Sequence, residues 1–395
     1  MNNNIIKLAD FDLSELEEWL SAELSIGTPA GQRNSPNGRH SYRSKQIHQW
    51  LGLGAQSFDD MTNLPRELRA ELASRAITGI PEIIAETRSS RDGTIKFGMK
   101  TIDNCIIESV LMRYRHGFSV CVSSQAGCRM GCAFCATKPK NFARNLSPGE
   151  MFGQAVAIAR HISSSKNSRA PGSAEDGSAG APGNAEDGDG GAVAGKGNMQ
   201  RISNVVVMGI GEPFDNYENT LKFIKLLHLH DKTGISYRKF TISTCGVLPG
   251  ILRLAEEGLP IGLAVSLHAP NDNIRSMIMP VNRSYSIDKL LEGCKIYTYK
   301  TRRRVSFEYA LMKGVNDAPG DAVELVRKIR GMLCHVNLIP VNKTENSEYM
   351  PSPKESIARF SDILTKGGIN NTVRRELGTD IMAACGQLRN SMMQY

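Results

Sequence analysis

The chain has 395 residues, of which 41% are hydrophobic and 22% charged, with a formal net charge of +8. These proportions exclude a chain that is disordered throughout, a collagen-like chain and a long coiled coil. No apolar run approaches the roughly 18 residues that a membrane helix needs. The first residues carry acids where a signal peptide has a basic end, so we expect a cytoplasmic protein without a membrane segment. The modest excess of Lys and Arg is compatible with RNA as a partner.

Residues 1–100 predict a small helical module with a strand pair at its end. Apolar side chains in residues 41–74 recur at helical spacing, and Pro65 stands near a helix start. Residues 94–114 contain the segments GTIKFGMK and NCIIESVLMRY, which are typical of two paired strands. We therefore place an N-terminal domain at residues 1–100, with the strand pair linking it to the rest of the chain.

Residues 163–200 differ in composition from the rest of the chain. They contain no Ile, Leu, Phe, Tyr or Trp, and the tract GSAEDG at Gly172–Gly177 recurs as GNAEDG at Gly183–Gly188. Such a segment cannot bury enough apolar surface to offset the entropy of ordering. We predict a disordered surface insertion here, with a functional tail as the alternative, and expect the fold to continue on its far side.

From residue 205 onward, short apolar runs alternate with stretches of helical periodicity. This rhythm predicts βα units around a parallel sheet, in a partial or full barrel. No GxGxxG follows a predicted strand, which argues against a dinucleotide-binding fold. We predict an α/β fold, a partial TIM-type barrel with its core in residues 101–162 and 201–345 and a C-terminal segment at 346–395. The predicted strands are 205–208, 239–243, 262–267, 305–311 and 335–339, and the predicted helices are 220–230, 248–257, 287–299, 322–332 and 356–366.

Three of the nine cysteines, Cys128, Cys132 and Cys135, form a CxxxCxxC motif. In a reducing compartment such clustering points to a metal or to catalysis rather than to disulfides. Three thiolates can hold three irons of a four-iron cluster and leave the fourth iron open to a ligand. Structural zinc is the rival, but it needs four ligands and usually paired CxxC motifs, and no second pair or adjacent His completes such a site.

The CxxxCxxC motif is that of the radical S-adenosylmethionine (SAM) superfamily, and further motifs narrow the resemblance. Together they resemble the RlmN/Cfr family of radical SAM RNA methyltransferases over about residues 42–388, apart from the insertion. Within that family the branch that methylates adenine C2 carries GEP and NLIP, whereas the C8 branch carries GEA and NLIR. Pro213 and Pro340 place this chain with the C2 branch. The motifs are 121–128 (CVSSQAGC), 134–137 (FCAT), 143–146 (ARNL), 209–213 (GIGEP), 242–244 (IST), 266–268 (SLH), 314–317 (GVND), 336–342 (VNLIPVN) and 380–388 (DIMAACGQL).

The resemblance implies a radical reaction, which suits adenine because its C2–H is neither acidic nor nucleophilic enough for polar methyl transfer. A first SAM methylates Cys385, whose thiolate is a soft nucleophile. A second SAM at a [4Fe-4S] cluster yields a 5′-deoxyadenosyl radical, which takes hydrogen from that methyl group, and the methylene radical adds to C2. Cys121 then forms a disulfide with Cys385 and releases the product. Glu108 matches the family's proton acceptor, although how Glu108 and Cys121 share proton removal stays open.

The resemblance also implies a set of SAM-binding residues near predicted strand ends. Strand-end polar residues also serve as loop caps, and Asn337 is an alternative to Asn342. Taken alone, Cys121 and Cys385 would be interpreted as small buried cysteines, and Glu108 as an exposed strand residue. The implied SAM-binding residues are Gly211, Glu212, Ser243, Ser266, Leu267, His268 and Asn342.

The implied substrates are 23S ribosomal RNA, at the peptidyl transferase centre in a protein-poor assembly intermediate, and tRNA, at the adenosine 3′ of the anticodon. The N-terminal module is expected to bind RNA. Flavodoxin or ferredoxin is expected to supply electrons, and the protein is expected to be a monomer. Two rival functions stay open at this point. One is the C8 methyltransferase, and the other is a zinc-containing RNA-binding protein without catalysis.

Overall fold

The computed structural model describes residues 5–24, 39–115, 117–137, 142–164, 202–342, 348–384 and 386–388. The predicted insertion, residues 163–200, begins two residues too early, because Ser163 and Ser164 complete a helix that starts at Pro148. Residues 165–200 lie outside the described ranges, so their disorder stays a prediction. No helix in the described ranges is long and apolar enough to cross a membrane.

A ten-stranded sheet forms the centre of the molecule, in the order β14-β13-β12-β11-β10-β9-β6-β5-β4-β3. From β14 to β6 every neighbouring pair is parallel, whereas β3, β4 and β5 form an antiparallel meander that continues the sheet beyond β6. The sequential order of the parallel strands is that of a barrel opened along one side. The strands are β3 (Glu82–Arg88), β4 (Ile95–Lys100), β5 (Ile106–Tyr114), β6 (Gly117–Cys121), β9 (Ile202–Val207), β10 (Phe240–Thr244), β11 (Gly262–Ser266), β12 (Val305–Leu311), β13 (Cys334–Pro340) and β14 (Asn371–Val373).

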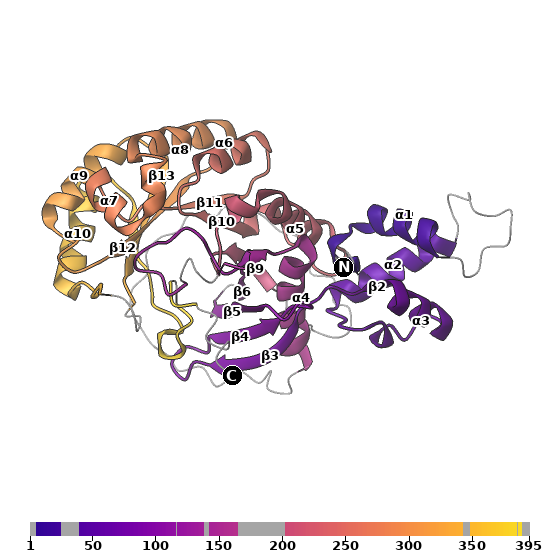
Figure 1. Cartoon of the computed structure of the whole chain (residues 1–395). Coiled ribbons are helices and arrows are strands. Elements are labelled where there is room, and N and C mark those ends of the chain that lie inside the picture. The colour runs from indigo at the N-terminus through magenta and orange to yellow at the C-terminus, as the bar shows by residue number, and fades with distance from the viewer. Residues whose placement is uncertain are drawn as a thin grey trace.

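Helices follow the parallel strands and lie on the outer side of the arc that the strands form (Figure 1). Each strand and helix predicted after residue 205 is present, with ends shifted by a few residues, so the α/β partial barrel is confirmed. The antiparallel part of the sheet is larger than predicted. The two strands predicted within residues 94–114 also pair with β3 on one side and with β6 on the other. The helices are α4 (Pro148–Ser164), α5 (Tyr217–Leu229), α6 (Leu248–Glu256), α7 (Asp272–Ile278), α8 (Ile287–Thr301), α9 (Pro319–Ile329) and α10 (Lys354–Lys366).

The N-terminal module contains α1 (Leu13–Glu23), α2 (Arg39–Gly52) and α3 (Arg66–Arg75) and lies at one end of the molecule (Figure 1). A short parallel pair, β1 (Ile6–Lys7) with β2 (Ala76–Ile77), joins its first and last parts. Helix α1 was not predicted, although Asp12 and Glu15 form a capping box at its start, a signal that the sequence contains. Apolar side chains from the three helices are buried in the same core cluster as those of the barrel.

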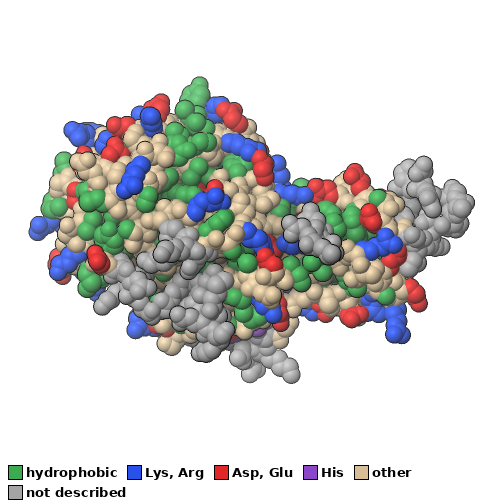
Figure 2. All heavy atoms as spheres, in the orientation of Figure 1, with side chains coloured by type: hydrophobic (Ala, Val, Ile, Leu, Met, Phe, Trp, Pro, Cys, Tyr) green, Lys and Arg blue, Asp and Glu red, His purple; other side chains and the backbone are tan. Residues whose placement is uncertain are grey.

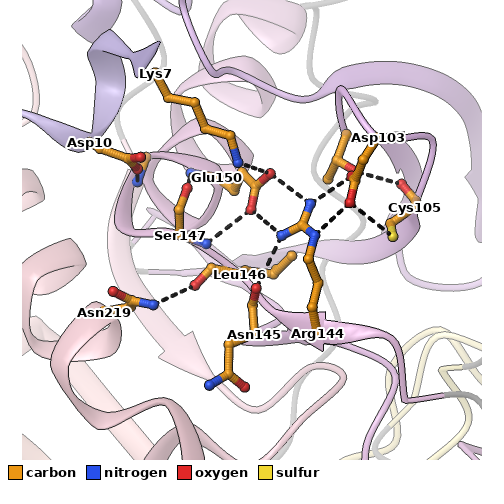
Figure 3. Close-up of polar contacts among 12 residues, drawn as sticks. Lys7, Asp10, Asp103, Cys105, Arg144, Asn145, Leu146, Ser147, Glu150 and Asn219 are labelled. Atoms are coloured by element: carbon orange, nitrogen blue, oxygen red, sulfur yellow. Dashed lines mark hydrogen bonds and ion pairs between the residues drawn. The ribbon is translucent and has the colours of Figure 1, made fainter. Parts of the chain in front are cut away.

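A network of charged side chains fixes this module to the barrel (Figure 3). The buried Glu150, in the first turn of α4, accepts from Lys7 Nζ at 2.7 Å and from Arg144 Nη1 at 2.7 Å. Arg144 also donates to Asp103 through Nε at 2.6 Å. Burial raises the pKa of Glu150, but the hydrogen bonds from Arg144 and Lys7 outweigh it, so the pKa lies below its usual value. Because a buried charge is tolerated only when it is paired, this network holds residue 7 and residue 144 at fixed positions.

Two histidines stack where the module meets the barrel. The rings of His48, on α2, and His230, at the end of α5, have centroids 3.9 Å apart and an interplanar angle of 19°. His230 Nδ1 accepts from the backbone N–H of Lys232, so its Nε2 carries the proton that is donated to the carbonyl of His48 at 2.7 Å. Burial lowers the pKa of His48 to about 4 and also lowers that of His230. Both rings are therefore neutral at pH 7.

We expect the free energy of unfolding to fall between pH 7 and pH 5 because of this pair. Below pH 6.5 a histidine of the unfolded chain binds a proton that folded His48 does not bind until about pH 4. Linkage then predicts a loss of about 2 kcal/mol from His48 alone. Urea unfolding at the two pH values should show a smaller loss for His48→Phe, which retains a stacked ring but cannot titrate. An equal loss in both proteins would contradict this assignment.

Candidate active site

The carboxyl ends of the parallel strands surround a cavity with about 1070 Å³ of free space. In parallel barrels these strand ends meet at one rim, where residues far apart in sequence come together. The cavity contains the three clustered cysteines and all of the predicted SAM-binding residues except Leu267. Those lining it are Cys128, Cys132, Cys135, Gly211, Glu212, Ser243, Ser266, His268 and Asn342.

The three cysteines lie on the loop between β7 (Gln125–Ala126) and β8 (Arg144–Asn145) and are half-buried. Two backbone hydrogen bonds tie this loop to other segments, from Ala133 N to the carbonyl of Ile278 and from Ala136 N to that of Gly386. Phe134 packs edge-on against His268, with ring centroids 4.9 Å apart. The loop is therefore held against the rim by contacts that do not depend on a metal.

The thiol chemistry fits a cluster. Burial raises the pKa of Cys128 to about 11 and raises that of Cys132 as well, with neighbouring cysteines adding to the effect. Such thiols become ligands when a strong local positive charge removes their protons. In the described part of the chain no three metal-binding side chains converge on a single point.

Glu212 follows β9 and is only 2% exposed. Its two carboxylate oxygens accept from backbone N–H groups, Oε1 from Phe214 at 3.0 Å and Oε2 from Cys245 at 2.7 Å. Burial nevertheless raises its pKa above the usual value. Glu212 thus holds the ends of β9 and β10 together.

His268 and Leu267 follow β11 but have different roles in the structure. His268 has a left-handed backbone with φ of 54°, and its Nδ1 accepts from the backbone N–H of Ala310 at 2.9 Å. Burial lowers the pKa of His268 to about 3, so the ring is neutral and offers Nε2–H as a donor. Leu267 is buried in the apolar core and is absent from the cavity wall, while its backbone N–H donates to the carbonyl of Glu308.

A second cavity adjoins the first and contains Cys121, the last residue of β6. The two cavities share five lining residues: Met208, Ile339, Pro340, Asn342 and Arg374. Cys385 lies outside the described residues. The positions on either side of it are described, and Ala383 and Leu388 belong to the same buried cluster as Cys121 and Val110.

Glu108 lines neither cavity. It is buried on β5, two residues before Val110, and Val110 pairs with Cys121 of β6. Taken alone, the sequence favoured an exposed strand residue, but Glu108 is only 1% exposed because β5 lies inside the ten-stranded sheet between β4 and β6. Two further residues were missed, Glu308 and Arg374, whose carboxylate and guanidinium lie 3.5 Å apart at the cofactor cavity. A signal for Glu308 was present, because a single Glu interrupts the apolar strand VSFEYAL.

Comparisons with known proteins show similarity over nearly the whole chain. Residues 191–326 match the family model for the radical SAM superfamily, a span that begins after the three cysteines, and residues 35–78 match the ribosomal RNA large subunit methyltransferase N-terminal domain. A probable dual-specificity RNA methyltransferase RlmN from Clostridium tetani is 41% identical over 98% of this chain and 96% of its own length. One from Alkaliphilus oremlandii is 44% identical over 98% and 99%. The crystal structure of a radical SAM methyltransferase from Sphaerobacter thermophilus matches with a TM-score of 0.82 and 41% identity, covering 97% of this chain and 99% of that one.

We expect Gly211→Ala to damage the cofactor cavity. Gly211 has φ of +113°, and an added Cβ would lie 2.6 Å from Ser124 Oγ and 2.7 Å from Gln125 Cβ. The strain should lower the free energy of unfolding by about 1–3 kcal/mol and weaken SAM binding, measured by urea unfolding and calorimetry. Gly320→Ala is the matched control, because a Cβ there meets nothing and Ala favours the helix. Equal behaviour of the two variants would contradict the assignment.

Proposed function

The chain belongs to the RlmN family of radical SAM RNA methyltransferases, and we propose that it methylates C2 of adenine in 23S ribosomal RNA and in tRNA. The observation that carries the proposal is the shared wall between two cavities. One holds the three clustered cysteines and the other holds Cys121. A cofactor site next to a reactive thiol is what a methyl transfer through cysteine needs.

The proposed cofactors are a [4Fe-4S] cluster, held by Cys128, Cys132 and Cys135, and SAM. When bound, they supply the methyl group and the carbon-centred radical that an unactivated C2–H requires. Glu212 and His268 offer an acceptor and a donor toward the SAM site. Ser243, Ser266 and Asn342 line the same cavity and complete the proposed polar contacts.

Cys385 is the proposed methyl carrier and Cys121 the thiol that releases the product. Once the Cys385 methylene carbon is bonded to C2, Glu108 accepts the proton that C2 loses, and the unpaired electron left by radical addition would pass to the oxidised cluster that Cys128, Cys132 and Cys135 would hold. The Cys121 thiolate then attacks the Cys385 sulfur, and the sulfur–carbon bond breaks as the disulfide forms. The bonding pair stays on the methylene carbon, which takes a proton and becomes the new methyl group. Each turnover therefore ends with a disulfide that must be reduced.

Two rivals are less well supported. The C8 methyltransferase uses the same cofactors, but Pro213 and Pro340 match the C2 branch. A zinc-containing RNA-binding protein without catalysis would need no second thiol site. Neither the cavity around Cys121 nor its shared wall with the cysteine cluster has a role in that function.

The proposed partners follow from the substrate. Ribosomal RNA in a protein-poor assembly intermediate and tRNA would contact the N-terminal module, and flavodoxin or ferredoxin would supply electrons to a monomeric cytoplasmic enzyme. Figure 2 shows Lys and Arg side chains spread over one face with acidic side chains among them, rather than in one basic patch. On that face, RNA recognition by shape and local contacts is favoured over a single electrostatic groove.

The first test uses anaerobically reconstituted protein, reductant, SAM with a fully deuterated methyl group, and unmodified ribosomal RNA and tRNA. We expect 2-methyladenosine with two deuterons in the new methyl group, because one deuterium leaves when the Cys385 methyl group becomes a methylene. Mass spectrometry of the digested RNA gives both the position and the label. 8-Methyladenosine would support the rival, and three retained deuterons would exclude the methylene route.

The second test separates the two thiols. Cys121→Ala should accumulate a covalent RNA adduct, since the methylene carbon bonds to C2 but no thiolate releases it. Cys385→Ala should form no adduct, because the methyl carrier is missing. Denaturing gels of labelled RNA measure both outcomes. Cys294→Ala, at a buried cysteine in α8 away from both cavities, is the control. Normal turnover by either active-site variant would contradict the scheme.

A further inference from the structure

The meander presents one of its faces to the reaction site. Side chains alternate along a strand, so Glu108 and Val110 of β5 share a face with their partners Gly98 and Lys96 of β4. Cys121 of β6 is paired with Val110 and lies on the same face. Ser109 points the opposite way, where its hydroxyl donates to Gln154 of α4 at 2.7 Å. This face therefore carries Lys96, Glu108 and Cys121 together.

Lys96 and Glu108 form a buried ion pair. Lys96 Nζ lies 3.6 Å from Glu108 Oε1, and the two side chains are 10% and 1% exposed. Directly opposite Glu108 stands Gly98, which has no side chain, so the long Lys96 side chain reaches its diagonal neighbour without obstruction. A carboxyl group this deeply buried favours its neutral form unless an opposite charge lies close to it.

The backbone of Glu108 is fixed as well. The hydroxyl of Ser123 donates to the carbonyl of Glu108 at 2.6 Å and accepts from the backbone N–H of Ile210 at 2.9 Å. This ties β5 to the loop that leads from β9 to Gly211. The position of Glu108 relative to the cofactor cavity is thus set by contacts that do not involve Lys96.

Other charged groups near this face are paired elsewhere in the described structure. Lys100, on the same face of β4, has its ion pair with Glu82 at 3.6 Å. Arg374, across the second cavity, has its ion pair with Glu308 at 3.5 Å. The remaining titratable groups of the face in the described residues are the Cys121 thiol and the Tyr114 phenol, each of which adds negative charge when it ionises. Lys96 is the cation whose ion-pair contact with Glu108 carries the inference.

We propose that Lys96 is a positioning residue that keeps Glu108 ionised on the face that it shares with Cys121, ready to accept the C2 proton. This rests on the proposed function, in which Glu108 is the proton acceptor. At Glu108 the step is the transfer of a proton from C2 to the carboxylate, while the unpaired electron left by radical addition would pass to the oxidised cluster of the proposed function. Removal of Lys96 should slow proton acceptance without affecting the formation of the C2 adduct.

The test is a single-turnover reaction of reconstituted enzyme with RNA, followed from pH 6 to 9. Denaturing gels measure the adduct, and mass spectrometry measures 2-methyladenosine. In Lys96→Met the adduct should accumulate, and the rise of product formation with pH should shift upward by roughly 1–3 pH units, because the carboxylate loses its stabilising cation. Lys96→Arg keeps the charge and should restore most of the wild-type profile.

Lys100→Met is the matched control, because it removes a lysine four residues away on the same face without touching Glu108. Its profile should coincide with that of the wild type. The double variant Lys96→Met, Glu108→Gln should be no slower than Glu108→Gln alone, since Lys96 acts through Glu108. Formation of 5′-deoxyadenosine should be unchanged in Lys96→Met, whereas general damage to the fold would lower it. Lys96→Gln provides a polar uncharged replacement if Lys96→Met does not fold.

The outcomes separate the two proposals. Absence of 2-methyladenosine from the wild type would overturn the proposed function. A wild type that makes it, together with a Lys96→Met or Lys96→Gln profile that does not shift, would overturn the role of Lys96 alone. A shift that Lys96→Arg does not reverse would also overturn it, because the positive charge would then be irrelevant.

Discussion

The parallel pairing of β6 with β9 is the contact on which the arrangement of the site depends. It aligns Cys121 with Val206, and the pairing continues past the strand ends through hydrogen bonds from Val122 N to Val206 O and from Gly209 N to Val122 O. On one side of this joint lies the meander with Lys96 and Glu108, and on the other lie the strands of the barrel. Because the carboxyl ends of neighbouring parallel strands meet at one rim, this pairing brings the Cys121 thiol beside the cavity that contains the three clustered cysteines.

Two buried carboxylates fix segments at that rim. Glu212 is held by two backbone N–H groups, and Glu308 by Asn337 and Arg374. Each would be costly to bury without those partners, so each fixes the segments that supply them. The walls of the cavity are therefore set by the protein itself. Groups held in this way need little rearrangement when a ligand arrives, which is the condition for electrostatic preorganisation.

The C-terminal segment closes the second cavity from outside the barrel strands. The backbone N–H of Gly378 donates to Asp92 Oδ2 at 2.8 Å, and Thr137 Oγ1 donates to the carbonyl of Leu388 at 2.8 Å. The segment is thus attached both to the meander and to the loop that carries the three cysteines. The two tasks of the proposed function, holding the cofactor and releasing the product, are assigned to separate cavities that share a wall through Arg374 and Pro340.

Periodicity alone determined the alternating strands and helices after residue 205, because each element buries one face and repeats at its own spacing. Cysteine spacing alone identified Cys128, Cys132 and Cys135 as a candidate site, since side chains within eight residues of one loop stay close together. Tertiary structure decided what depends on contacts between distant segments. The antiparallel extension of the sheet depends on the pairing of β5 with β6. Whether Leu267 lines the cavity depends on the direction of its side chain, which points into the apolar core. The Glu308–Arg374 and Lys96–Glu108 pairs needed strand register, which sets which charged side chains face each other and which no local pattern reveals.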